Sequence, residues 1–124
     1  MNILVIDDLA AMRAFVRAGI KISFRGSVLQ IEEAETGAAA VKELQNRKYD
    51  LILCDWNMPG MSGVELLQWV KQQDDLKNIP FIMLTANNKK DMVMEAIKLG
   101  VNDFITKPTT IEILAAKLRP FIKE

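Results

Sequence analysis

The chain has 124 residues, with 16 basic and 16 acidic side chains that leave no formal net charge, and half of its residues are hydrophobic. This length and composition indicate one folded domain over residues 1–124 rather than intrinsic disorder. The zero charge argues against nucleic-acid binding by a broad basic face. One cysteine and no histidine exclude an internal disulfide, a zinc cluster and a histidine-dependent catalytic triad.

No segment has the pattern of a membrane anchor or a secretory signal. The longest apolar runs fall far short of the roughly 20 residues that a membrane-spanning helix needs. The N-terminus also lacks a basic region before its apolar residues. We therefore expect a cytoplasmic protein without a membrane contact.

Strand and helix patterns alternate along the chain. In chain order, the predicted strands lie at 3–6, 28–35, 50–55, 81–84 and 103–106. The predicted helices follow them, over about 10–21, after Thr36, after Ser62, over about 89–99 and after Thr109. The continuous apolar runs at 3–6 and 51–54 are typical of strands buried on both faces, as in a parallel sheet.

Several local signals predict where the helices begin and end. Thr36 is a candidate N-cap, and two patterns predict capping boxes, Ser62 with Glu65 and Thr109 with Glu112. Gly100 predicts the end of the fourth helix. Pro120 should kink or shorten the last one.

Five successive strand–helix units predict parallel strands joined by right-handed crossovers, with helices on both faces of the sheet. A closed barrel of eight such units needs roughly twice this length. The predicted fold class is therefore an open, doubly wound α/β sheet. Ligands bind such sheets beyond the carboxyl ends of the strands, at the topological switch point.

Polar residues follow four of the predicted strands at this edge. Asp7 and Asp8 follow the first, Asp55 the third, Thr85 the fourth and Lys107 the fifth. Each alone is most often a cap or turn residue, but the ordered set predicts one site if the first and third strands are neighbours. Three carboxylates need an offsetting cation, and oxygen ligands suit Mg²⁺. With a lysine and a hydroxyl beside them, such carboxylates could hold a tetrahedral dianion such as an aspartyl phosphate.

The runs at 5–8, 54–63, 84–86 and 103–108 resemble the receiver domains of bacterial two-component response regulators, particularly the single-domain chemotaxis regulators. The resemblance covers essentially the whole chain. It implies a flavodoxin-like (βα)5 fold with the strand order 2-1-3-4-5, an order taken from such regulators and not from the periodicity.

The resemblance also implies a chemistry. Asp55 would accept a phosphoryl group from a phosphohistidine on a histidine kinase or histidine phosphotransfer protein, and Lys107 would pair with a phosphoryl oxygen. Mg²⁺ would be bound by the side chains of Asp8 and Asp55, by the backbone carbonyl of Asn57 and through a water by Asp7. Because this chain has no histidine, the donor histidine must belong to a partner.

The same resemblance implies a switch. Thr85 would turn inward to bond the phosphate and Phe104 would rotate with it, changing the surface of the fourth helix, fifth strand and fifth helix. That surface would serve a downstream protein target or a missing output domain. Asn57 and Asn87 would tune the phosphoryl lifetime, and the Lys107–Pro108 bond would be cis.

Two other functions fit parts of the pattern. A Mg²⁺-dependent phosphatase with an aspartyl nucleophile would have an Asp-x-Asp pair and a substrate cap, whereas Asp7 and Asp8 are adjacent and no insertion is present. A degenerate receiver that only binds partners would not need the intact acidic set. We expect no turnover of an external substrate, only self-phosphorylation and slow dephosphorylation. The extent of the chain fits a stand-alone regulator or a receiver from a larger protein.

Overall fold

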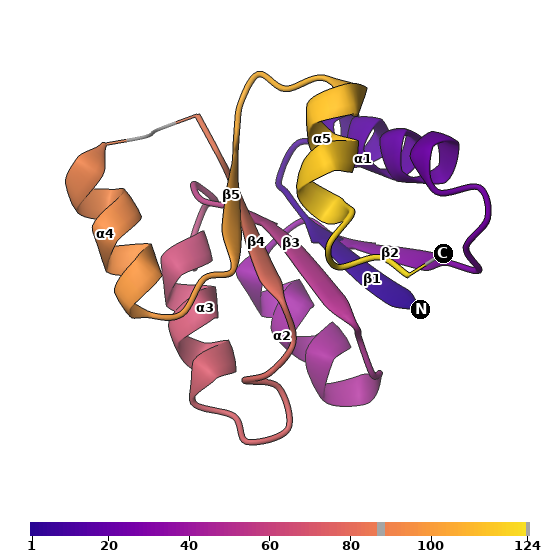
Figure 1. The fold of residues 1–124 in the computed structure, drawn as a ribbon. Coiled ribbons are helices and arrows are strands. Elements are labelled where there is room, and N and C mark those ends of the chain that lie inside the picture. The colour runs from indigo at the N-terminus through magenta and orange to yellow at the C-terminus, as the bar shows by residue number, and fades with distance from the viewer. Residues whose placement is uncertain (87–88, 124) are drawn as a thin grey trace.

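The computed structural model describes residues 1–86 and 89–123, and in these ranges five strands alternate with five helices (Figure 1). The strands are β1 (Asn2–Ile6), β2 (Gln30–Ala34), β3 (Leu51–Asp55), β4 (Phe81–Thr85) and β5 (Asp103–Thr106). The helices are α1 (Ala10–Ser23), α2 (Gly37–Asn46), α3 (Gly63–Lys71), α4 (Lys90–Lys98) and α5 (Ile111–Leu118). In this part of the chain no helix has both the length and the apolar character needed to cross a membrane.

The strands form one parallel sheet in the order β2-β1-β3-β4-β5, which confirms the flavodoxin-like order that the resemblance implied. β1 pairs on both sides, with Val5 opposite Glu33 of β2 and Leu53 of β3. The chain leaves β1 toward one edge of the sheet and returns past it to β3. The loops after β1 and β3 therefore diverge, and this divergence is the switch point of the sheet.

Helices cover both faces of the sheet (Figure 1). Residues of α1 and α5 belong to one buried apolar cluster, and residues of α2, α3 and α4 belong to the other. β1 serves both, because its side chains alternate between the two faces. Ile3 and Val5 lie in the first cluster, and Leu4 and Ile6 lie in the second. The continuous apolar run at 3–6 therefore correctly predicts a strand that is buried on both faces.

Most helix-end signals hold in the structure. Ser62 and Glu65 form the predicted capping box at the start of α3. The Thr36 hydroxyl accepts from the backbone N–H of Ala39, as an N-cap does. Gly100 has a φ of +93° just after the last turn of α4. The last helix ends at Leu118, two residues before the proline.

The predicted cap of the last helix is wrong by one residue. Thr110, not Thr109, accepts from the backbone N–H of Ile113, and α5 begins at Ile111. Thr110 has the extended backbone of an N-cap, whereas the Thr109 hydroxyl donates to the carbonyl of Thr110. Glu112 is therefore one residue too early to complete a capping box.

The second strand is shorter than predicted. It begins at Gln30, which lies opposite Asn2 at the start of β1. Val28 precedes this first pair, and its side chain is 88% exposed. Ahead of that pair, the amino group of Met1 still donates to the carbonyl of Val28 at 3.1 Å, but this single contact does not extend the strand.

α3 begins in direct contact with the end of β3. The backbone N–H of Gly63 donates to the carbonyl of Trp56 at 2.8 Å. A Cβ at position 63 would clash with the backbone carbonyl oxygen of Asp55 and would lie 3.0 Å from Trp56 Cα and from the sulfur of Met83. The missing side chain lets α3 pack closely against the strand that ends in Asp55.

Gly63→Ala is therefore expected to lower the free energy of unfolding by about 1–3 kcal/mol, because backbone atoms must move to admit the methyl group. Urea denaturation monitored by circular dichroism measures the loss. Gly26→Ala is the matched control, since no heavy atom lies within 4 Å of a Cβ at that exposed position. Equal midpoints for the two variants would contradict the close-approach argument.

Candidate functional site

Three carboxylates meet where the two central strands end. Asp7 and Asp8 directly follow β1, and Asp55 is the last residue of β3. Because β1 and β3 are parallel neighbours, carboxylate oxygens of all three lie within 4.8 Å of one another. Asp7 and Asp55 are only 2% and 6% exposed, whereas Asp8 is exposed. The cluster is therefore buried at its base and open to solvent at Asp8.

Lys107 reaches this cluster from the loop after β5, across β4. Its ammonium donates to Asp7 Oδ2 at 2.9 Å and to Asp55 Oδ1 at 3.0 Å. Its backbone N–H donates to the carbonyl of Thr85 at 2.8 Å, which fixes the loop to the end of β4. The bond to Pro108 is cis, as expected from the resemblance.

The charges of the cluster are strongly coupled. Burial raises the pKa of Asp55, the charges of Asp7 and Asp8 raise it further, and the hydrogen bond and charge of Lys107 oppose both effects. Burial alone would lower the pKa of Lys107, but its bonds to Asp7 and Asp55 and their charges raise it overall. One ammonium faces three carboxylates, so excess negative charge remains. These oxygen donors are the type that hard divalent cations prefer, and the cluster could hold a metal ion.

The two switch candidates lie beside the cluster on neighbouring strands. Thr85 ends β4 and is 2% exposed. Phe104 on β5 is partly buried against the core, and its ring stacks on that of Trp56, with centroids 6.4 Å apart and an interplanar angle of 23°. Trp56 directly follows Asp55 and is itself buried. An aromatic pair thus joins the end of β3 to the outer strand of the sheet.

The remaining predicted site residues are less informative. Asn57 lies in the loop after β3 with an exposed side chain. Asn87, the second residue expected to tune the phosphoryl lifetime, lies outside the described residues.

Cys54 is fully buried and donates to the carbonyl of Asp55 at 3.2 Å. Burial raises the pKa of this thiol well above its ordinary value, so it behaves as a small core residue and not as a nucleophile.

Sequence reasoning missed two contacts of the site. Lys107 was expected to pair with phosphate, and its bond to Asp7 was not foreseen, although both residues follow strands at the same edge. The stacking of Trp56 on Phe104 was also not predicted. The pairing of β3, β4 and β5 places these rings together, and no local pattern reports it.

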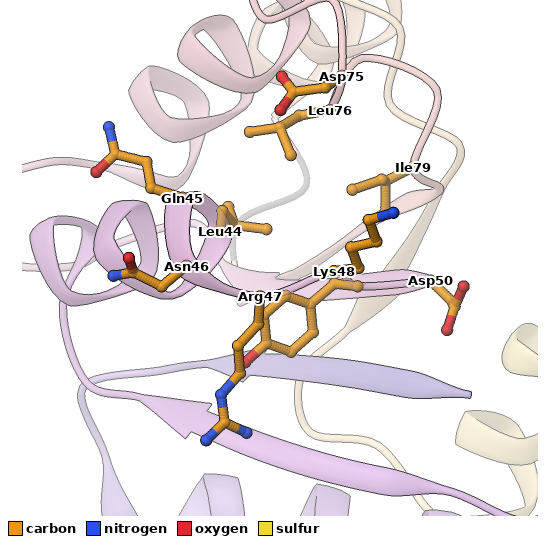
Figure 2. Close-up of a pocket in the computed structure, with 10 residues that line it drawn as sticks. Leu44, Gln45, Asn46, Arg47, Lys48, Asp50, Asp75, Leu76 and Ile79 are labelled. Carbon is orange, nitrogen blue, oxygen red and sulfur yellow. The ribbon is translucent and has the colours of Figure 1, made fainter.

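A cavity of about 610 Å³ lies at the opposite end of the sheet (Figure 2). It is lined by residues 44–50, 75, 76 and 79, from the end of α2 and from the loops that precede β3 and β4. Asp50 in its wall directly precedes β3 and Asp55 in the cluster ends it, a separation of five residues, or about 16 Å in extended chain. The cavity therefore takes no part in the acidic site.

The chain matches a known protein family over most of its length. The sequence model of the family described as "Response regulator receiver domain" matches residues 3–119. This chain is a response regulator receiver domain. Accepting a phosphoryl group within two-component systems is the known role of this family, whose members interact with histidine kinases and with downstream targets.

Individual relatives agree with the assignment. The receiver domain is 36% identical over 119 residues to chemotaxis protein CheY of Pseudomonas aeruginosa, covering 95% of this chain and 93% of the relative. Chemotaxis protein CheY-3 of Vibrio cholerae is 37% identical over 119 residues, covering 95% and 88%. The solved structure of the chemotaxis response regulator CheY4 of Vibrio cholerae superimposes with a TM-score of 0.87 at 27% identity, covering 98% of both chains.

Replacing Asp55 should stabilise the metal-free receiver domain. The raised pKa means that the folded state holds the ionised carboxylate less favourably than the unfolded chain does. Asp55→Asn should therefore increase the free energy of unfolding at neutral pH. The gain should shrink as the pH falls through the raised pKa and vanish below the ordinary value of 3.8, where the carboxyl is protonated in both states.

Urea denaturation across this pH range, with a chelator present, measures the effect. Asp74→Asn is the matched control, because that side chain is fully exposed, and it should give no such gain. An Asp55→Asn protein less stable than the wild type at neutral pH would contradict the electrostatic description of the cluster.

Proposed function

We propose that Asp55 is the residue of this receiver domain that accepts a phosphoryl group from a phosphohistidine on a partner histidine kinase or phosphotransfer protein. The observation that supports this assignment is the bond of 3.0 Å from Lys107 to Asp55 Oδ1, within a cluster of three carboxylates. Phosphoryl transfer needs positioning and charge neutralisation more than covalent chemistry from the protein. We also propose that residues 1–124 form a single receiver domain.

The cation of this site is proposed to be Mg²⁺. The carboxylates of Asp7, Asp8 and Asp55 offer only oxygen atoms within a span of 4.8 Å, which fits a small hard ion. The backbone carbonyl of Asn57 is proposed as a further ligand. When bound, Mg²⁺ supplies positive charge that offsets the oxygens of the incoming phosphoryl group.

The chain's own residues then have distinct tasks. A carboxylate oxygen of Asp55 attacks phosphorus, an O–P bond forms, the P–N bond to the donor histidine breaks, and the released imidazole takes a proton from water. Lys107 already lies against Asp55 and can contact a phosphoryl oxygen while it keeps its bond to Asp7. The reaction modifies this chain itself, and we propose only slow loss of the phosphoryl group and no external substrate.

We propose that Thr85 and Phe104 transmit the effect of phosphorylation from the site to the protein surface. The Thr85 hydroxyl would bond the new phosphoryl oxygens, and Phe104 would move with it. Two contacts support this: the Thr85 carbonyl binds the backbone of Lys107, and the Phe104 ring packs on Trp56 beside Asp55. The phosphorylated state would then favour a different α4–β5–α5 surface for a downstream protein or an output domain. Asn57 and Asn87 are proposed to set the lifetime of that state.

Phosphorylation by a small acyl phosphate with Mg²⁺ tests the assignment of the acceptor. Intact-mass spectrometry should show one added phosphoryl group on the wild type and on Asp74→Asn, and none on Asp55→Asn. Lys107→Met should react far more slowly, because one positive charge at the transferring oxygens is lost. No adduct on the wild type would favour a receiver that only binds partners, and rapid turnover of phosphate esters would favour a phosphatase.

Thr85→Ala should separate phosphorylation from switching. The variant should still take up the phosphoryl group, but the change in hydrogen exchange across α4, β5 and α5 on phosphorylation should be largely lost. Thr106→Ala is the matched control, because Thr106 is the exposed residue opposite Thr85 in the β4–β5 register and should retain the change. An unaltered exchange response in Thr85→Ala would contradict the switch.

A further inference from the structure

Two arginines of α1 share one carboxylate of β2. Arg13 Nε lies 3.0 Å from Glu33 Oε1, and Arg17 Nε lies 2.9 Å from Glu33 Oε2. The two arginines are four residues apart and therefore stack on the same side of the helix. Their partner and charge are the same, so their second contacts distinguish them.

Those second contacts lead to different parts of the molecule. Arg17 Nη2 donates to the carbonyl of Ile31 at 2.7 Å, on β2 at the edge of the sheet. Arg13 Nη1 donates at 2.7 Å to the carbonyl of Asp7, the first residue of the acidic cluster. The Arg13 side chain is also the more buried of the two, 15% exposed against 33% for Arg17.

The carbonyl of Asp7 belongs to the peptide that joins Asp7 to Asp8. The N–H of Asp7 donates to the carbonyl of Ala34, and its Oδ1 accepts from the N–H of Leu9 at 3.0 Å. With the bond from Arg13, the peptide group on each side of the Asp7 Cα is held. The orientation of the peptide between Asp7 and Asp8 sets the direction of the Asp8 side chain. Asp8 is the exposed carboxylate of the cluster.

We propose that Arg13 is a positioning residue for the divalent-cation site, with Glu33 as the carboxylate that orients its guanidinium. By holding the Asp7–Asp8 peptide, Arg13 presents both side chains to one ion together with Asp55. The inference rests on the proposed function, since it assumes that Mg²⁺ binds at this cluster. Residues that orient metal ligands in this way typically contribute about 10–100-fold to metal affinity.

Titration of the full chain with Mg²⁺ tests the proposal, with tryptophan fluorescence, to which Trp56 beside Asp55 contributes, and isothermal calorimetry as two independent readouts. Arg13→Met should raise the Kd for Mg²⁺ by about 10–100-fold. Arg17→Met is the matched control, because it loses the same charge and the same Glu33 bond, and its Kd should equal that of the wild type. Arg13→Lys should recover part of the affinity, since one ammonium can still donate to the Asp7 carbonyl.

Hydrogen exchange at the Leu9 amide, which bonds the Asp7 carboxylate, gives a readout that needs no metal and should be faster in Arg13→Met alone. Equal Kd values for the wild type and Arg13→Met would overturn the positioning role and leave the metal site intact. Equal losses in the two methionine variants would also overturn it, because only the shared ion pair would then matter. A wild type that binds no Mg²⁺ would overturn both this inference and the proposed metal site.

Discussion

The ammonium of Lys107 between Asp7 and Asp55 is the contact on which the site depends. Two nearly buried carboxylates with a third beside them repel one another unless positive charge offsets them. Lys107 offsets part of this charge at distances of 2.9 and 3.0 Å. The negative charge that remains suits a bound cation, and a cation there would also offset the negative oxygens of an incoming phosphoryl group.

The fold makes this contact possible because it brings distant segments to one edge. Asp7 and Lys107 are 100 residues apart in the chain, yet the sheet order places their strands close enough for a direct bond. The same edge of the sheet also connects the site to β5, the outer strand. Trp56 directly follows Asp55, and its ring stacks on that of Phe104 of β5. Asp55, the ammonium of Lys107 and the outer strand are thus one packed unit.

Strand-end patterns in the sequence predict most of the site and part of the fold. Continuous apolar runs reveal β1 and β3, and the polar residues after them reveal Asp7, Asp8 and Asp55. The strand order came from resemblance, because periodicity reports which residues are buried and not which strands pair. The Arg13–Asp7 bond had no local signal, since it depends on how α1 packs on the sheet. The cap at Thr110 was missed because only Thr109 has a glutamate three residues later, whereas the helix begins after the neighbouring threonine.

Reduction with borohydride tests whether the phosphoryl group resides on Asp55, as we propose. An aspartyl phosphate is an acyl phosphate, so borohydride converts that residue to homoserine, whereas unmodified carboxylates do not react. After phosphorylation, reduction and proteolysis, peptide mass spectrometry should find homoserine at position 55 and nowhere else. Homoserine at position 7 or 8, or a phosphoryl group that borohydride does not remove, would contradict the account.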